Sequence, residues 1–208
     1  MTPLPVQGLY SLTDNPLSTR EGLISAVEGA IRGGAAMVQY RDKGTDGERR
    51  HKEARALLAL CRSSGVPLII NDDVDLAKAI GADGVHIGKH DLLLSSTRKT
   101  LGKESIIGVS CYDSIEIAER AQREGADYVA FGRFHPSHTK PEATPVTTGQ
   151  LREFRRHIHL PIAAIGGITP ENGAPLITAG ANFLAVIHGI FGQPDPKAAA
   201  QSYAKLFA

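Results

Sequence analysis

Short apolar runs rich in strand-forming residues recur along the chain, and longer amphipathic stretches separate them. Successive runs begin roughly 15 to 35 residues apart, which is too far for hairpins and suits a helical crossover between parallel strands. The predicted strands are Leu9–Thr13, Ala36–Arg41, Leu68–Asn71, Gly84–Ile87, Ile106–Ser110, Tyr128–Phe131, Ile162–Ile165 and Phe183–Ile187. The pattern therefore predicts parallel strands that alternate with helices.

The stretches between these runs place their apolar residues at helical spacing, and helices are predicted over Leu23–Arg32, Arg49–Cys61, Val74–Ile80 and Ile115–Glu124. A Gly-Ala pair stands just before four of the strands, at Gly34-Ala35, Gly81-Ala82, Gly125-Ala126 and Gly180-Ala181. Glycine just past the last helical turn can take a positive φ and end the helix. The repeated joint indicates one supersecondary unit used many times.

A run of strand–helix units in 208 residues predicts a single (β/α)8 TIM barrel that occupies residues 1–208 as one domain. An open, doubly wound sheet is the alternative. Its glycine-rich fingerprint after the first strand is absent from the sequence, which disfavours it.

Composition narrows the function. The formal net charge is +1, so there is no basic footprint for nucleic acid or for an anionic membrane. The first residues resemble no signal peptide and no apolar stretch is long enough to span a bilayer, so we expect a cytoplasmic protein. The two cysteines, Cys61 and Cys111, are expected to be free thiols. A homo-oligomer is compatible with the sequence, which does not give the oligomeric state.

Polar residues follow almost every predicted strand, at the barrel end where active sites of this fold lie. Gln39 and Arg41 are two apart on a strand and should face the same side, with Lys43 following at the rim. Two cations beside an amide suit a polyphosphate. The alternative is a rim salt bridge, for example between Arg41 and Asp42.

Asp72 and Asp91 follow neighbouring strands and are candidate Mg2+ ligands. Proteins usually hold Mg2+ through one or two carboxylates, while waters and substrate phosphates complete the shell. Both residues could instead be ordinary helix caps, because aspartate is a good N-cap.

Two glycine turns suggest a phosphate site. Gly166-Gly167 follows the seventh strand, and Ile187-His188-Gly189 follows the eighth. TIM barrels frequently bind phosphate with the backbone of these two loops. His188 could add a donor or only pack.

The loop that contains Ser137, His138, Thr139 and Lys140 could clamp an anion, and the alternative is a surface loop without function. His86 is expected to be a hydrogen-bonded histidine of the barrel rather than a catalytic group. The sequence contains no evident Ser-His-Asp or Cys-His set, which disfavours hydrolysis through a covalent intermediate.

Taken together these residues resemble the thiamine phosphate synthase family. The motifs that carry the resemblance are Leu12-Thr13-Asp14, Gln39-Tyr40-Arg41-Asp42-Lys43, Ile70-Asn71-Asp72, Gly84-Val85-His86-Ile87-Gly88 with Asp91, Gly108-Val109-Ser110, Thr139-Lys140-Pro141 and Ala164-Ile165-Gly166-Gly167-Ile168. They span the chain from about Leu9 to Phe191 in family order. Many family members have serine where His188 stands.

The resemblance implies a transferase that joins 4-amino-2-methyl-5-hydroxymethylpyrimidine diphosphate to 4-methyl-5-(2-phosphoethyl)thiazole, giving thiamine phosphate and diphosphate. It assigns Arg41, Lys43, Asn71, Ser110 and Lys140 to the diphosphate, and Asp72 and Asp91 to Mg2+. It places Gln39 against the pyrimidine. It assigns Ser137, Thr139, Gly167, Ile187 and His188 to the thiazole phosphate.

Two other functions compete with this one. A thiazole tautomerase-like isomerase would share the fold and the phosphate turns but would not need a diphosphate–Mg2+ site. A non-catalytic sensor of phosphorylated metabolites would need only the phosphate turns. The presence of Arg41, Lys43, Asp72, Asp91 and Lys140 favours the synthase.

Overall fold

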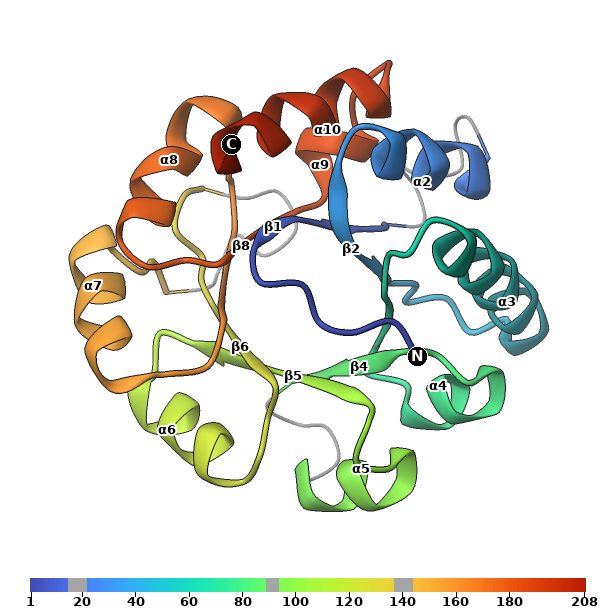
Figure 1. The fold of residues 1–208 in the computed structure, drawn as a ribbon, viewed down its shortest axis with the longest axis horizontal. Helices are drawn as coiled ribbons and strands as arrows, with labels where there is room; N and C mark the ends of the chain where they lie inside the picture. The colour runs from blue at the N-terminus through green and yellow to red at the C-terminus, as the bar shows by residue number, and fades with distance from the viewer. Residues whose placement is uncertain (15–21, 89–93, 137–143) are drawn as a thin grey trace.

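The computed structural model of the chain describes residues 1–14, 22–88, 94–136 and 144–208 (Figure 1). Within these residues the strands are all parallel and close into a barrel in chain order, β1 to β8. They are β1 (Gly8–Leu12), β2 (Ala35–Tyr40), β3 (Leu68–Asn71), β4 (Gly84–Ile87), β5 (Ile106–Tyr112), β6 (Tyr128–Phe131), β7 (Ile162–Ile165) and β8 (Phe183–Val186). The predicted (β/α)8 barrel is confirmed, and the open doubly wound sheet is wrong.

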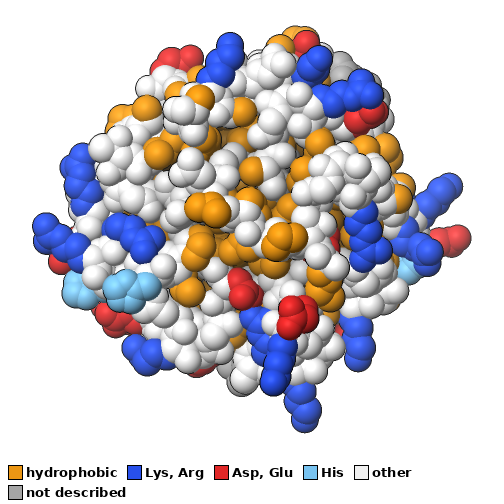
Figure 2. Space-filling model, viewed as in Figure 1, with side chains coloured by type: hydrophobic (Ala, Val, Ile, Leu, Met, Phe, Trp, Pro, Cys, Tyr) orange, Lys and Arg blue, Asp and Glu red, His pale blue; other side chains and the backbone are white. Residues whose placement is uncertain are grey.

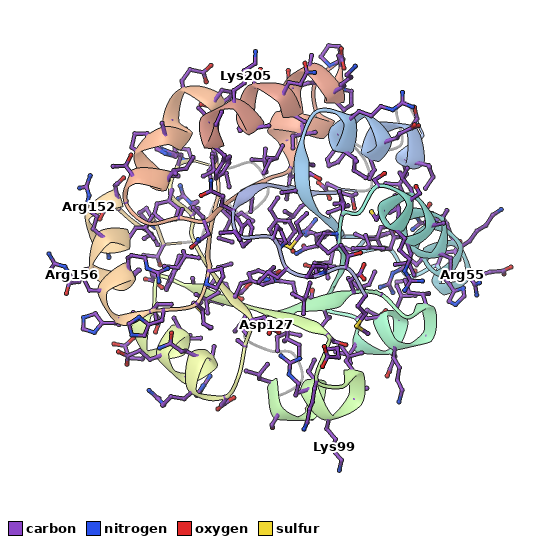
Figure 3. The ribbon with its side chains drawn as sticks, viewed as in Figure 1. Arg55, Lys99, Asp127, Arg152, Arg156 and Lys205 are labelled. Carbon is purple, nitrogen blue, oxygen red and sulfur yellow. The ribbon has the colours of Figure 1, made fainter. Side chains whose placement is uncertain are left out.

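Helices surround the barrel on its outer side (Figure 1). They are α2 (Leu23–Arg32), α3 (Gly47–Ser63), α4 (Val74–Ile80), α5 (Leu94–Leu101), α6 (Ile115–Arg123), α7 (Thr148–His157), α8 (Pro170–Thr178), α9 (His188–Phe191) and α10 (Pro196–Ala204), followed by the 3-10 helix η1 (Lys205–Phe207). Charged side chains such as Arg55, Lys99 and Arg156 extend away from the barrel (Figure 3). The apolar helix faces therefore pack on the sheet, as the helical spacing predicts.

The repeated Gly-Ala joints have the backbone conformation that the sequence predicts. Gly81 ends α4 in the left-handed region, with φ 70°. Gly125 and Gly180, at the ends of α6 and α8, have φ 87° and 111°. Each glycine turns the chain from its helix into the next strand without the strain that a side chain would add.

Three of these joints are followed by a polar residue whose side chain accepts a hydrogen bond from the backbone of a neighbouring strand. Asp83 accepts a hydrogen bond from Leu68 N–H (3.0 Å). Asp127 accepts one from Ile107 N–H (2.7 Å), and Asn182 accepts one from the N–H of Ile162 (3.1 Å). Each side chain thus satisfies a backbone donor at the amino end of the preceding strand, which accounts for the polar residue in the repeat.

The core has two layers. One lies between the sheet and the helices, and the other fills the interior of the barrel. In the interior, Tyr10, Tyr128 and Phe183 pack edge to face, with ring centroids 5.9 to 6.5 Å apart. These rings close the barrel beneath the polar residues at its mouth, so the interior is a packed core and not a pore.

The N-terminal segment covers the end of the barrel where the strands begin, and it crosses the barrel in Figure 1. The backbone N–H of Thr2 donates to Asp83 (2.7 Å), and Asn182 donates to the carbonyl of Val6 (3.2 Å). Hydrophobic side chains gather over the centre of this face, while Lys and Arg lie mostly around it (Figure 2). Among the described residues, no helix is both long and apolar enough to cross a membrane.

Both cysteines are buried free thiols, as the sequence predicts. Burial raises the pKa of Cys61 and of Cys111 to about 12. At pH 8 the reactive thiolate would then be about one part in ten thousand. We expect iodoacetamide at pH 8 to modify neither thiol in the folded protein and both after unfolding in denaturant, as followed by intact mass. Rapid labelling of the folded protein would contradict this.

Candidate functional site

The polar residues at the carboxyl ends of the strands converge on one cavity of about 620 Å3 at the mouth of the barrel. The predicted site residues that line it are Gln39, Arg41, Asn71, Ser110, Gly167, Ile187 and His188. Lys43 and Asp72 line an adjoining pocket of about 420 Å3, to which Asn71 also contributes. The other predicted site residues, Asp91, Ser137, Thr139 and Lys140, lie outside the described residues.

Arg41 follows β2 and points to the cavity. Its guanidinium donates to Asp14 at 2.9 Å, and only 15% of its side chain is exposed. Thr13 and the Arg41 backbone exchange two hydrogen bonds, of 2.9 and 3.2 Å, which join the ends of β1 and β2. An arginine held in this way presents its remaining donors to the cavity.

Arg41 does form a salt bridge at the rim, as the alternative has it, but its partner is Asp14 and not Asp42. The Asp42 carboxylate turns away and binds Arg49 at 2.6 Å, and it accepts the N–H of Gly44 at 2.7 Å. Burial alone would raise the pKa of Asp42, but the Gly44 N–H and Arg49 hold it below its ordinary value. Asp42 therefore fixes the loop after β2, and the partner of Arg41 is Asp14, just past the end of the neighbouring strand β1.

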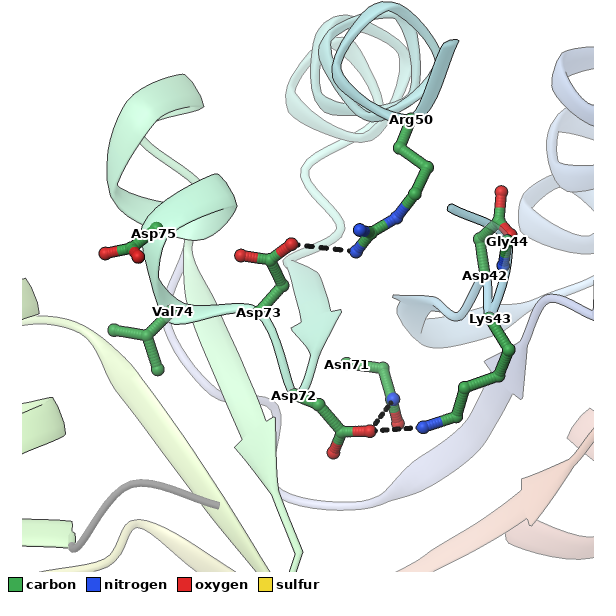
Figure 4. A pocket seen from close by; sticks show the side chains of 9 residues that line it. All are labelled: Asp42, Lys43, Gly44, Arg50, Asn71, Asp72, Asp73, Val74 and Asp75. Atoms are coloured by element: carbon green, nitrogen blue, oxygen red, sulfur yellow. Dashed lines mark hydrogen bonds and ion pairs between the residues drawn. The ribbon is translucent and has the colours of Figure 1, made fainter. Parts of the chain in front are cut away.

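Lys43, Asn71 and Asp72 form a polar cluster in the adjoining pocket (Figure 4). Lys43 Nζ lies 2.5 Å from Asp72 Oδ2, and Asn71 Nδ2 donates to the same oxygen at 2.6 Å. Asp72 has a left-handed backbone with φ 62°. This conformation is uncommon outside glycine but tolerated by Asp and Asn, and it directs the carboxylate to the rim of the barrel.

Asp72 is not the cap of α4, so that alternative is wrong. The cap is Asp73, whose side chain accepts the N–H of Leu76 at 2.9 Å. Asp73 also binds Arg50 at 2.8 Å. Because Asp73 caps α4, the carboxylate of Asp72 takes part in the polar cluster at the rim.

The described residues fit a Mg2+ ion that is shared with a phosphorylated substrate. Among them, no group of three or more His, Cys, Asp or Glu side chains could hold a metal by itself. Asp72 supplies one hard carboxylate at the rim, beside the cation of Lys43. This donor set matches a site in which substrate oxygens and waters provide most of the ligands.

The two glycine turns follow the neighbouring strands β7 and β8, and both line the cavity. Gly166 and Gly167 have φ 104° and 62°, and a side chain on Gly167 would come within 2.3 Å of the carbonyl oxygen of Pro136. His188 begins the short helix α9, and its side chain is exposed at the rim. The exposed side chain does not pack in the core, and its contact with a phosphate stays a prediction.

His86 is a hydrogen-bonded histidine of the barrel, as predicted. Its Nδ1 lies 2.9 Å from the hydroxyl of Tyr128, and its Nε2 lies 2.8 Å from Ser110 Oγ. The ring is 8% exposed and stacks on Tyr128.

Sequence reasoning missed several residues that line the cavity, among them Arg133 and Tyr10. Arg133 comes two positions after the end of β6, and a polar residue just past a strand is the general signal that pointed to the barrel mouth. Tyr10 lies within β1 and carried no such signal, since an aromatic residue inside a strand ordinarily belongs to the core.

The closed barrel and its polar mouth define the class: a (β/α)8 enzyme whose site is built from the loops after the strands. Residues 9–190 match the family described as thiamine monophosphate synthase. Thiamine-phosphate synthases of Thiobacillus denitrificans and Nitrosococcus oceani are 51% and 50% identical, each over 97% of this chain and over 95% and 93% of their own lengths. The solved thiamine phosphate pyrophosphorylase from Pyrococcus furiosus superposes with a TM-score of 0.88 at 30% identity, covering 96% of this chain and 95% of its own.

The chain therefore belongs to the thiamine monophosphate synthase family. It is an enzyme of the transferase class, and the resemblance drawn from its motifs is confirmed.

Proposed function

We propose that the chain condenses a hydroxymethylpyrimidine diphosphate with a thiazole phosphate in a Mg2+-dependent reaction that gives thiamine phosphate and diphosphate. The observation that supports this most is the joint presence of two cations, an amide and a carboxylate at the barrel mouth. Arg41 lines the main cavity, while Lys43 and Asp72 lie in the pocket that shares Asn71 with it. A tautomerase or a sensor would need the glycine turns but not this cluster.

In the proposed complex, Arg41, Lys43, Asn71 and Ser110 bind the diphosphate, together with Lys140. The pyrimidine lies against Gln39, deeper in the barrel. The thiazole phosphate lies at the opposite glycine turns, bound by Gly167, Ile187 and His188 with Ser137 and Thr139 from the loop after β6. The two substrates then meet in the cavity of about 620 Å3.

Asp72 and Asp91 would hold the Mg2+ ion. When bound, the ion supplies positive charge to the diphosphate and so improves it as a leaving group. Lys43 lies 2.5 Å from Asp72, so the same ammonium can shift to the diphosphate once the carboxylate has another cationic partner.

The chemistry that remains for the protein is charge stabilisation and alignment. The C–O bond between the pyrimidine methylene and the diphosphate breaks, and the thiazole nitrogen forms the new C–N bond. Arg41 and Lys43 stabilise the charge that develops on the departing oxygen. The attacking nitrogen carries no proton, so no general base is required. The walls of the cavity hold nitrogen and carbon in line.

A coupling assay tests the proposal. Purified protein is mixed with both substrates in Mg2+ or in EDTA, and thiamine phosphate is detected as its fluorescent thiochrome. We expect product only with Mg2+, and a loss of more than about tenfold in Lys43→Ala because a charged hydrogen-bond donor is removed. Lys99→Ala, on the outer surface of α5, is the matched control and should stay at the wild-type rate. Folded protein that makes no product would refute the synthase and favour the tautomerase or sensor.

A further inference from the structure

A chain of hydrogen bonds crosses the interior of the barrel at the floor of the cavity. Gln39 Nε2 donates to the hydroxyl of Tyr10 at 2.6 Å, and that hydroxyl lies 2.8 Å from the hydroxyl of Tyr128. Tyr128 contacts His86 Nδ1 at 2.9 Å, and His86 Nε2 contacts Ser110 Oγ at 2.8 Å. We call these five residues the interior relay. They come from five strands, and all of them except Tyr128 line the cavity.

The relay is built into the core. Gln39 and Tyr10 are each 1% exposed, and Tyr128 is fully buried. A side chain on Gly108 would lie 2.0 Å from Cζ of Tyr128, so the glycine makes room for this ring inside the barrel. Tyr128 therefore cannot turn its hydroxyl to water and must satisfy it within the barrel, whereas Tyr10 also lines the floor of the cavity.

The hydrogen bonds of the relay have one direction. The amide nitrogen of Gln39 can only donate, so the oxygen of Tyr10 accepts. Burial raises the pKa of both tyrosines well above the ordinary value, so each keeps one proton to give. With the oxygen of Tyr10 accepting from Gln39, the direction that keeps both phenolic protons hydrogen-bonded within the relay runs from Tyr10 to Tyr128 and from Tyr128 to His86 Nδ1.

A histidine that accepts at Nδ1 carries its proton on Nε2. It then donates to Ser110 Oγ and cannot remove the serine proton. A Ser–His contact of 2.8 Å with this direction does not activate the serine as a nucleophile. With its oxygen occupied by His86, the hydroxyl of Ser110 directs its own proton into the cavity.

We infer that the interior relay is a positioning device: it holds His86 as the neutral Nε2–H tautomer and thereby makes Ser110 an obligatory donor to an anionic oxygen in the cavity. That this oxygen belongs to the diphosphate rests on the proposed function. The tautomer of His86 does not depend on the proposed function. Tyr10, Tyr128 and His86 are in this sense positioning residues that act through Ser110.

The tautomer can be measured without substrates. In protein labelled with 15N histidine, long-range 1H–15N correlations distinguish protonated from unprotonated ring nitrogens, and the signals missing in His86→Asn identify His86. We expect an unprotonated Nδ1 and a protonated Nε2. In Tyr128→Phe this single tautomer should be lost. A protonated Nδ1 in the wild type, alone or in an imidazolium, would overturn the inference.

A double-mutant cycle tests whether the relay acts through Ser110. Ser110→Ala and Tyr128→Phe should each raise the KM for the pyrimidine diphosphate about tenfold, as expected for a hydrogen bond to a charged group. The KM for the thiazole phosphate should change less than about twofold. In the Ser110→Ala background, Tyr128→Phe should have no further effect. Additive effects would refute the relay as a device that acts through the serine.

The same four proteins can be titrated with inorganic diphosphate and Mg2+ by calorimetry, which separates the two proposals. Protein that makes no thiamine phosphate but shows the Nε2–H tautomer and a non-additive loss of diphosphate affinity would refute the proposed reaction and support the relay. Protein that makes thiamine phosphate but loses diphosphate affinity additively in the two variants would support the proposed reaction and refute the relay.

Discussion

Replacing Asp72 with asparagine is expected to lower Mg2+-dependent formation of thiamine phosphate by about 10²- to 10³-fold. Asparagine tolerates the left-handed backbone of this position, φ 62°, and keeps the shape of the side chain. It removes the carboxylate charge that the proposed metal site requires. The Lys43–Asp72 pair is 62% and 32% exposed, so the free energy of unfolding should change by at most about 1 kcal/mol.

Initial rates measured across a Mg2+ titration check this expectation, because a lost ligand also raises the Mg2+ concentration needed for half-activation. Glu104→Gln is the matched control. It makes the same change of charge at an exposed position of the turn between α5 and β5. Its rate should stay within about twofold of wild type, as surface charges contribute little. Wild-type activation by Mg2+ in Asp72→Asn would exclude Asp72 from the metal site.

The barrel could be predicted from sequence because its signals are local and repeated. Each unit has an apolar strand, an amphipathic helix and a glycine that ends the helix, as at Gly81. Such signals need no knowledge of distant contacts. The positions of Gln39 and Arg41 followed from strand alternation, and both line the same cavity.

The alternation still holds at Arg41, the first residue past β2, and fails further along the loop. β2 stops at Tyr40, so Lys43 lies in the adjoining pocket and not with Arg41. The sequence pattern also did not predict which residues form ion pairs between neighbouring strands. Arg41 binds Asp14, which lies 27 positions away, rather than the adjacent Asp42.

The hydrogen bonds inside the barrel could not be predicted either, because they too join residues on different strands. Tyr10 and Tyr128 have the residue type of a strand core and do pack in one. Their hydroxyls meet only because the barrel closes, which brings β1 and β6 face to face across its interior. A pattern along the chain carries no information about that contact.

Replacing Gly167 with alanine is expected to reduce kcat/KM for the thiazole phosphate by about 10²-fold or more, since displacements near 1 Å have effects of this size. The new Cβ would lie 2.3 Å from the carbonyl oxygen of Pro136 and 2.8 Å from Cβ of His135. This loop cannot easily retreat, because the N–H of His135 donates to the carbonyl of Gly166 at 3.0 Å. The alanine should therefore push the turn and the loop apart where the phosphate is proposed to bind.

Stability should fall as well, by about 2 to 5 kcal/mol in the free energy of unfolding, from the positive φ and from overpacking together. Gly65→Ala separates the two causes. Gly65 has φ 67°, close to the 62° of Gly167, but a side chain there would meet no atom within 4 Å. Denaturant unfolding should show a loss of about 1 to 2 kcal/mol for Gly65→Ala, with unchanged kcat/KM. If Gly167→Ala lost no more stability than this control and kept its activity, the loop would be able to move aside, and the close approach of backbone at Gly167 would not be needed for the thiazole phosphate.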